Sequence, residues 1–187
     1  QRNIDEKTQS LSKLIGGPDP LDIKSQELAI QQRNNTLRDA EEKLIDFVRM
    51  MWPAVEPGRE LVEGWPLEAL CEHLEAVTDG RVSNLIVNVP PGFMKSLATN
   101  VFWPAWVWGP RNRPHTRFMA FSYSQSLTIR DNIRFRQVIM SSLYRKNWGD
   151  RFGPSEDSFS TIKVANDKTG RKLASSVGGS GLGEHPQ

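Results

Sequence analysis

The sequence predicts an α/β fold, in which a parallel sheet flanked by helices follows an N-terminal helical region. Residues 85–89 are a short, nearly all-apolar run, as expected of a strand covered on both faces. A tight Pro90-Pro91-Gly92 turn leads into a helical stretch over residues 95–108. Residues 117–123 have the pattern of a second buried strand, and residues 124–148 that of a long basic helix. Alternating strands and helices of this kind are typical of a parallel sheet.

The helical region ahead of the sheet spans residues 24–80. Apolar side chains recur at spacings of three and four in residues 24–52, which predicts a helix that Pro53 ends. After a loop over residues 53–64, a second helix is expected from Pro66 to about Thr78. Residues 1–23 are polar and are predicted to form an arm, so residues 24–187 hold the folded part, with a partial α/β core over 85–187.

The end of the chain has a different pattern. Residues 161–165 and 173–177 are expected to pair as a hairpin around the turn at residues 166–170. In the long helix over residues 124–148, the hydrophobic spacing predicts that four side chains face inward: Leu127, Ile133, Val138 and Leu143.

Composition excludes several classes of protein. Of the 187 residues, 25% are charged and 37% hydrophobic, which is typical of a globular chain rather than a disordered one. No apolar run approaches the roughly 20 residues of a membrane-spanning helix. The single cysteine, Cys71, rules out an internal disulfide framework, and the three histidines share no metal-ligand spacing. We therefore expect a cytosolic setting.

The chemistry indicated by the sequence lies at residues 87–96. A buried strand, a tight loop and then Lys-Ser at a helix start is the layout of a P-loop, in which backbone N–H groups face phosphate oxygens. Lys95 would hold the phosphates and Ser96 would ligate Mg²⁺. Val89 and Met94 stand where the usual spacing has glycine. The alternative is a proline-bounded turn capped by Ser96, with Lys95 solvated.

Several segments, taken in order, resemble the ATPase domain of the large terminase subunit of tailed phages. Residues 85–96 resemble the strand and phosphate loop of that family, and residues 64–74 resemble the segment that packs near adenine. Further similar segments follow in family order at residues 102–106, 121–124, 130–132, 166–170 and 175–183. The resemblance covers about residues 40–183, and it rests on the ordered set rather than on one motif.

The resemblance implies a P-loop NTPase that drives viral double-stranded DNA into a procapsid, using ATP and Mg²⁺. Its implied partners are the DNA, a portal protein, a small terminase subunit and further copies in a ring, all in the host cytoplasm. Lys95 would be the catalytic residue and Ser96 the metal ligand. The implied nucleotide-binding residues are Trp65, Pro91, Gly92, Phe93, Met94, Lys95, Ser96 and Leu97.

The sequence also departs from the family. Residues 88–96 contain no arginine, and Pro66 stands where a histidine often follows the tryptophan. The acidic strand of the family should follow Gly183 by a few residues, and the nuclease domain lies beyond it. We therefore expect an incomplete ATPase domain without the nuclease, in which ATP turnover is impaired.

Two other interpretations stay open. The chain could be a binding-only remnant that docks terminase or portal partners without turnover, or it could be another P-loop NTPase, such as a kinase. For Trp103, Trp106 and Trp108, core packing is favoured over base stacking. The basic residues of the long helix could contact DNA phosphates, but a solvated helix face is the simpler interpretation: Arg130, Arg134, Arg136, Arg145 and Lys146.

Overall fold

The computed structural model describes residues 20–176. The chain divides into two units, residues 1–38 and 39–187, and the second holds the fold described below. The predicted arm, apart from residues 20–23, and the glycine-rich residues 177–183 lie outside the described residues. No helix of the described part is both long and apolar enough to cross a membrane.

The helical region consists of α2 (Pro20–Glu42), α3 (Leu44–Met51), the short 3-10 helix η1 (Trp52–Ala54) and α4 (Trp65–Thr78). The prediction for α4 is confirmed, including its end at Gly80, which has the left-handed φ of +74° that favours glycine. The single helix predicted over residues 24–52 is wrong, because the chain breaks at Lys43.

The break at Lys43 arises because two side chains replace one backbone hydrogen bond. The N–H of Leu44 donates to the Glu75 carboxylate at 2.7 Å, and the carbonyl of Ala40 accepts from the Trp106 indole at 2.9 Å. In a continuous helix these two backbone groups would bond to each other. Lys43 consequently has extended backbone angles, φ −118° and ψ 130°. Burial of Glu75 raises the pKa of its carboxyl group.

The predicted helix over residues 95–108 is present in three parts: α5 (Lys95–Leu97), the π-helical turn η2 (Ala98–Phe102) and α6 (Trp103–Trp108). Pro104 has no N–H to donate to the carbonyl of Asn100 four residues earlier. The wider turn accommodates the proline, with the N–H of Trp103 bonded to the carbonyl of Ala98. Pro104, Ala105, Trp106, Val107 and Trp108 are buried.

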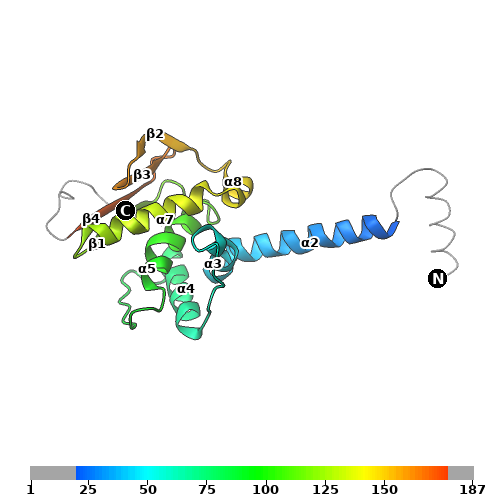
Figure 1. Cartoon of the computed structure of the whole chain (residues 1–187), viewed down its shortest axis with the longest axis horizontal. Coiled ribbons are helices and arrows are strands. Elements are labelled where there is room, and N and C mark those ends of the chain that lie inside the picture. The colour runs from blue at the N-terminus through cyan, green and yellow to red at the C-terminus, as the bar shows by residue number, and fades with distance from the viewer. Residues whose placement is uncertain (1–19, 177–187) are drawn as a thin grey trace. The chain divides into compact units, whose positions relative to one another are not determined.

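The sheet contains β1 (Arg117–Ser122), β2 (Pro154–Phe159), β3 (Lys163–Asn166) and β4 (Arg171–Ser176) in the order β1-β4-β3-β2 (Figure 1). The predicted hairpin is confirmed, and so is a strand at Arg117–Ser122, but the predicted burial of that strand is wrong: it lies at the edge of the sheet, and Phe121 is 56% exposed. The all-parallel sheet is wrong, because only β1 and β4 run parallel and the other two pairs are antiparallel. Strand β2 was not predicted, since its sequence, PSEDSF, is largely polar.

The strand predicted at residues 85–89 is also wrong. The segment pairs with no described strand, and Ile86 is 95% exposed. Leu85, Val87 and Val89 are half-buried, whereas the residues between them are exposed. This alternation indicates that one side of the segment is partly covered and the other is exposed, whereas the apolar composition predicted burial of both sides.

The long basic helix is divided into α7 (Gln125–Met140) and α8 (Ser142–Trp148). Ser141 between them is extended, and its hydroxyl caps α8 by accepting from the N–H of Tyr144 at 3.3 Å. Val138 is buried as predicted, but Ile133 and Leu143 are exposed and Leu127 is half-buried. The buried face of α7 instead carries Thr128, Asp131, Asn132, Phe135, Val138 and Ile139.

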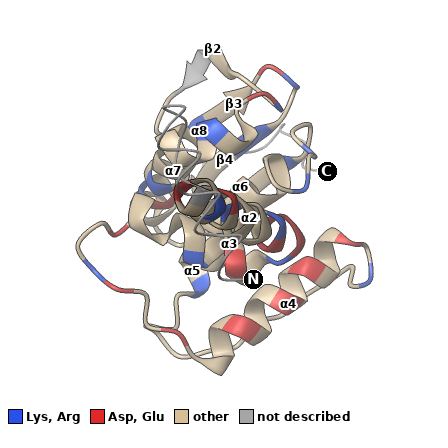
Figure 2. Ribbon diagram, turned by 90° about the vertical axis from the view of Figure 1, so that its right-hand side faces the viewer, with Lys and Arg blue, Asp and Glu red and all other residues tan. Residues whose placement is uncertain are grey.

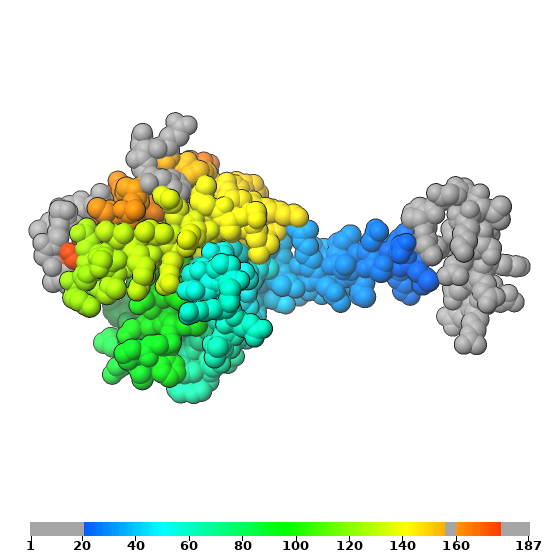
Figure 3. Space-filling model, viewed as in Figure 1, coloured from blue at the N-terminus to red at the C-terminus, as the bar shows by residue number. Residues whose placement is uncertain are grey.

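Helix α7 lies between the sheet and the helices, because it packs on β4 and β1 on one side and on η2 and α6 on the other (Figure 1). In Figure 3 the residues around 120–140, in yellow-green, form a band between the orange hairpin residues and the green residues of the α5–α6 region. The helical stretch over residues 95–108 and the sheet are therefore connected through α7.

We predict that Glu75→Ala lowers the free energy of unfolding by roughly 1–3 kcal/mol, because the N–H of Leu44 loses its acceptor inside the fold. Urea titration measures the change. Acidic residues follow one another along α4 (Figure 2), so exposed Glu72→Ala is a matched control and should have little effect. Glu75→Gln keeps an acceptor oxygen and should stay close to wild type. Equal losses for Glu75→Ala and Glu72→Ala would contradict the capping role.

Candidate phosphate-binding site

The loop ahead of α5 makes its turn through two residues in the left-handed region. Gly92 has φ +94° and Met94 has φ +55°, and α5 begins directly after Met94 with Lys95. The left-handed conformation costs a residue with a side chain about 1–2 kcal/mol, and glycine avoids that cost. Met94 therefore occupies a backbone geometry that suits the glycine expected at this position.

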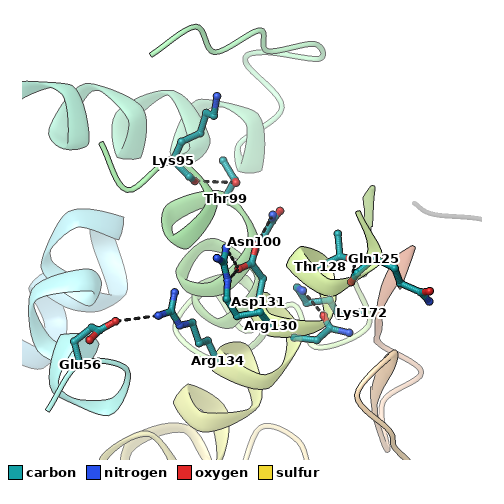
Figure 4. Close-up of polar contacts among 11 residues, drawn as sticks. Glu56, Lys95, Thr99, Asn100, Gln125, Thr128, Arg130, Asp131, Arg134 and Lys172 are labelled. Carbon is teal, nitrogen blue, oxygen red and sulfur yellow. Dashed lines mark hydrogen bonds and ion pairs between the residues drawn. The ribbon is translucent and has the colours of Figure 1, made fainter. Parts of the chain in front are cut away.

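Loop residues Val89 to Leu97 line a hollow of about 350 Å³. Lys95 and Ser96 are both exposed there, and the Thr99 hydroxyl bonds to the carbonyl of Lys95 at 2.9 Å. In Figure 4 the Lys95 side chain points away from Asp131 and Lys172 deeper in the fold. Seven of the eight predicted nucleotide-binding residues thus lie in one continuous stretch around the hollow: Pro91, Gly92, Phe93, Met94, Lys95, Ser96 and Leu97.

A second cavity, of about 380 Å³, adjoins the loop. Gly92, Phe93 and Met94 line it on one side, and Trp52 and Pro66 are among the residues opposite. It shares the lining residues Gly92, Phe93 and Met94 with the hollow beside Lys95, so both spaces border the same loop.

The far wall of this cavity is held by ion pairs. Arg49 donates to Glu63 at 2.6 Å and to Asp46 at 2.6 Å, which ties the loop over residues 55–64 to α3. The hydrogen bonds from Arg49 lower the pKa of the Glu63 carboxyl group, and both carboxylates raise the pKa of Arg49. The Trp52 indole also donates to the carbonyl of Arg59 at 2.7 Å.

Trp65 lies apart from the loop hollow. It is 78% exposed and lines a groove with His73 and residues 85–89 rather than the cavity beside Met94. The structure therefore does not bring Trp65 together with Lys95 and Ser96. Trp52 and Pro66, which sequence reasoning did not assign to the site, line the cavity next to the loop instead.

The chain matches no protein-family model, no curated protein and no solved structure.

What the site can do follows from its own chemical groups. The hollow is lined by Lys95, which has an ammonium group, and Ser96, which has a hydroxyl, and none of the described residues that line it is acidic. Such a set suits an anion with several oxygens. Among the side chains that the structure describes, which exclude those of residues 156–159, no group of three or more His, Cys, Asp or Glu could hold a metal ion.

The basic residues of α7 and α8 are largely engaged inside the fold. Arg134 pairs with Glu56 at 3.0 Å, and Arg145 donates to the carbonyls of Phe152 and Gly149. Arg130 pairs with Asp131 at 3.0 Å. These contacts favour a structural role for the basic residues of α7 and α8 over a role in binding DNA. Cys71 is buried as expected of a core residue, and burial raises the pKa of its thiol to about 12.

Sequence reasoning missed a group of buried polar residues on α7. Asp131 accepts from Asn100 on η2, Asn132 accepts from Lys172 on β4, and Thr128 donates to a backbone carbonyl of β4 (Figure 4). Lys172 is 1% exposed, and burial lowers the pKa of its ammonium group to about 8, with the charge of Asp131 acting in the opposite direction. Hydrophobic spacing could not reveal these residues, because each is polar.

We predict that Met94→Gly raises the free energy of unfolding by up to about 1 kcal/mol, because it relieves the left-handed strain at φ +55° but increases the freedom of the unfolded chain. It should leave ligand binding at the loop unharmed. Urea titration and a fluorescent ATP analogue measure the two effects. Phe93→Gly is the control, since no left-handed strain is recorded there. Loss of stability in Met94→Gly would show that packing of the Met94 side chain outweighs the strain.

Proposed function

We propose that the loop at Pro91–Leu97 binds the phosphates of ATP, with Lys95 on the phosphates and Ser96 on the accompanying Mg²⁺. One observation carries this proposal: the turn through Gly92 and Met94 places exposed Lys95 and Ser96 in the first helical turn, beside a hollow lined by the loop itself. An ammonium group and backbone N–H groups facing one space are what a polyphosphate needs.

The adjoining cavity supports a whole nucleotide rather than a free phosphate. It shares Gly92, Phe93 and Met94 with the loop hollow, and its apolar side chains include Trp52, Leu67 and Pro66. Binding pockets for small molecules are mostly apolar with a few polar groups. We therefore propose that the base lies in the cavity beside Trp52; the predicted base contact from Trp65, which lines a different groove, is the alternative placement.

The resemblance of residues 40–183 to large terminase subunits extends the proposal to a biological role. In that role the chain contributes the ATP-binding part of a motor that packages viral double-stranded DNA. Its partners would be the portal protein, the small terminase subunit and further copies in a ring. The proposal for this role rests on the order of the similar segments and not on the basic helices, because Arg134 and Arg145 make contacts within the fold.

A binding-only role for residues 1–187 is the second candidate, and one observation favours it. Phosphoryl transfer needs a carboxylate behind the metal and a positioned water. None of the described residues around the loop hollow supplies a carboxylate. The carboxylates among the described residues that line the adjoining cavity are Glu60 and Glu63, which are not part of the loop hollow, and Glu63 is held by Arg49 at 2.6 Å.

We predict that Lys95→Ala weakens ATP binding by at least about 1.5 kcal/mol, or roughly tenfold, because a hydrogen bond from a charged donor is lost. A fluorescent ATP analogue titrated in Mg²⁺ measures the dissociation constant. Lys146→Ala, on an exposed face of α8, is the control and should bind as wild type does. Equal affinity for Lys95→Ala and wild type would remove Lys95 from the site.

We further predict that residues 1–187 bind ATP but do not turn it over at a useful rate, because the loop hollow offers no carboxylate among its described residues. Steady-state phosphate release with Mg²⁺ and double-stranded DNA measures turnover. The comparison is a chain extended through an acidic strand and a nuclease domain. Turnover by residues 1–187 that matches the extended chain would mean that the catalytic carboxylate already lies within them.

A further inference from the structure

We propose that Asp131 is a positioning residue for the helix that begins at Lys95 and Ser96, acting through Asn100. The inference rests on the proposed phosphate site, whose geometry it explains. It assigns a purpose to a buried carboxylate that touches no part of the loop hollow.

The first step is the contact itself. Asp131 is 2% exposed, and its Oδ2 accepts from the Asn100 side-chain amide at 3.2 Å. Its Oδ1 accepts from Arg130 at 3.0 Å and 3.2 Å, so the buried charge is compensated. The two carboxylate oxygens therefore have separate partners, since one binds Asn100 and the other binds the half-exposed guanidinium group.

The second step is the π-helical turn that holds Asn100. Asn100 follows Ser96 by four residues and lies in the middle of η2, where the N–H of Trp103 reaches back to the carbonyl of Ala98. A π turn changes the direction of the side chains within it, and here Asn100 points to α7 (Figure 4). The π-helical turn therefore begins two residues after Ser96. Asp131 supplies a hydrogen bond to this turn from another helix, α7.

The third step is that α7 is itself fixed to the sheet by neighbouring polar residues. The Asn132 amide donates to the carbonyls of Ile162 at 2.8 Å and Thr161 at 3.2 Å, and its oxygen accepts from Lys172. The Thr128 hydroxyl donates to the carbonyl of Ser175 at 3.1 Å. Asp131 therefore stands on a helix that is tied to β4 and to the loop before β3.

Stability alone does not account for the Asp131–Asn100 pair. Replacing a buried polar pair by apolar residues of similar size is often neutral or stabilising, whereas a hydrogen bond fixes direction. An apolar contact at this point would hold the helices together but would leave the rotation of the π turn free. The hydrogen bond fixes the rotation of the π turn about the helix axis. It thereby also fixes the direction in which the side chains of Lys95 and Ser96 project from the first turn of the helix.

The experiment compares four variants of the chain: Asp131→Leu, Asp131→Asn, Asn100→Asp, and the double variant N100D/D131N. Asp131→Asn keeps an acceptor for Asn100 but removes the negative charge, so it loses the ion pair with half-exposed Arg130 and the charge that acts on buried Lys172. Asn100→Asp brings two carboxylates together, and the double variant restores one acid and one amide with their positions exchanged.

The first measurement needs no nucleotide. Amide hydrogen exchange over residues 95–102 is compared with exchange over α6, whose buried amides report global opening. We expect Asp131→Leu and Asn100→Asp to speed exchange over residues 95–102 by about tenfold or more with α6 unchanged. Asp131→Asn and the double variant should stay within about twofold of wild type. Exchange over residues 95–102 that is unchanged in Asp131→Leu overturns the positioning role. Exchange in the double variant as fast as in Asn100→Asp overturns it as well.

The second measurement is the affinity for a fluorescent ATP analogue in Mg²⁺. Asp131→Leu and Asn100→Asp should bind the analogue about tenfold more weakly than wild type. Asp131→Asn and the double variant should bind it as wild type does. If wild type itself binds no analogue, the proposed function fails, while the exchange data still decide the positioning role. If Lys95→Ala loses affinity but Asp131→Leu keeps it, the proposed function stands and the positioning role fails.

Discussion

The indole N–H groups of helix α6 impose the constraint around which the unit of residues 39–187 is built. Trp106 and Trp108 are almost fully buried, and a buried indole needs an acceptor. The Trp106 indole bonds to the carbonyl of Ala40, the Trp108 indole to that of Thr116, and the Trp103 indole to the Thr78 hydroxyl, at 2.8–2.9 Å. One short helix therefore fixes the end of α2, the end of α4 and the start of β1. The break at Lys43 is a direct consequence, because the carbonyl that Trp106 takes is the one that a continuous helix would use.

Elements whose stability depends on nearby residues could be predicted from the sequence. Helix α4, with proline in its first turn and Gly80 after its end, and the hairpin of β3 and β4 depend on local turn and capping chemistry. The break at Lys43 could not be predicted, because Glu75 and Trp106 lie far from it in sequence. The inward face of α7 was predicted wrongly for a related reason: Ile133 was expected to face inward because it is apolar, but the buried face carries polar Asp131 and Asn132 and leaves Ile133 exposed.

The position of the candidate site in the sequence could be predicted, but the residues that surround it in the fold could not. The order of prolines, glycine, lysine and serine located the loop, and its residues do line one hollow. The residues around the loop come from other elements, so no spacing along the chain indicates them. Trp52 lines the adjoining cavity, Arg49 holds Glu63 in its wall, and Asp131 bonds to Asn100 behind the loop. Trp65 was assigned by resemblance alone, and the groove that it lines is a different one.

Residues 85–89 show why apolar composition does not by itself make a strand. A strand covered on both faces needs neighbouring strands to satisfy its backbone, and no described strand pairs with this segment. It is nevertheless extended, and the prolines explain the geometry at its end. Pro90 disfavours the helical region for Val89, and Pro91 does the same for Pro90, so an extended approach to the loop needs no sheet. The same two rings reduce the freedom of the unfolded chain, which offsets part of the left-handed strain at Met94. The loop geometry therefore depends on its own prolines on one side and on the Asp131–Asn100 contact on the other.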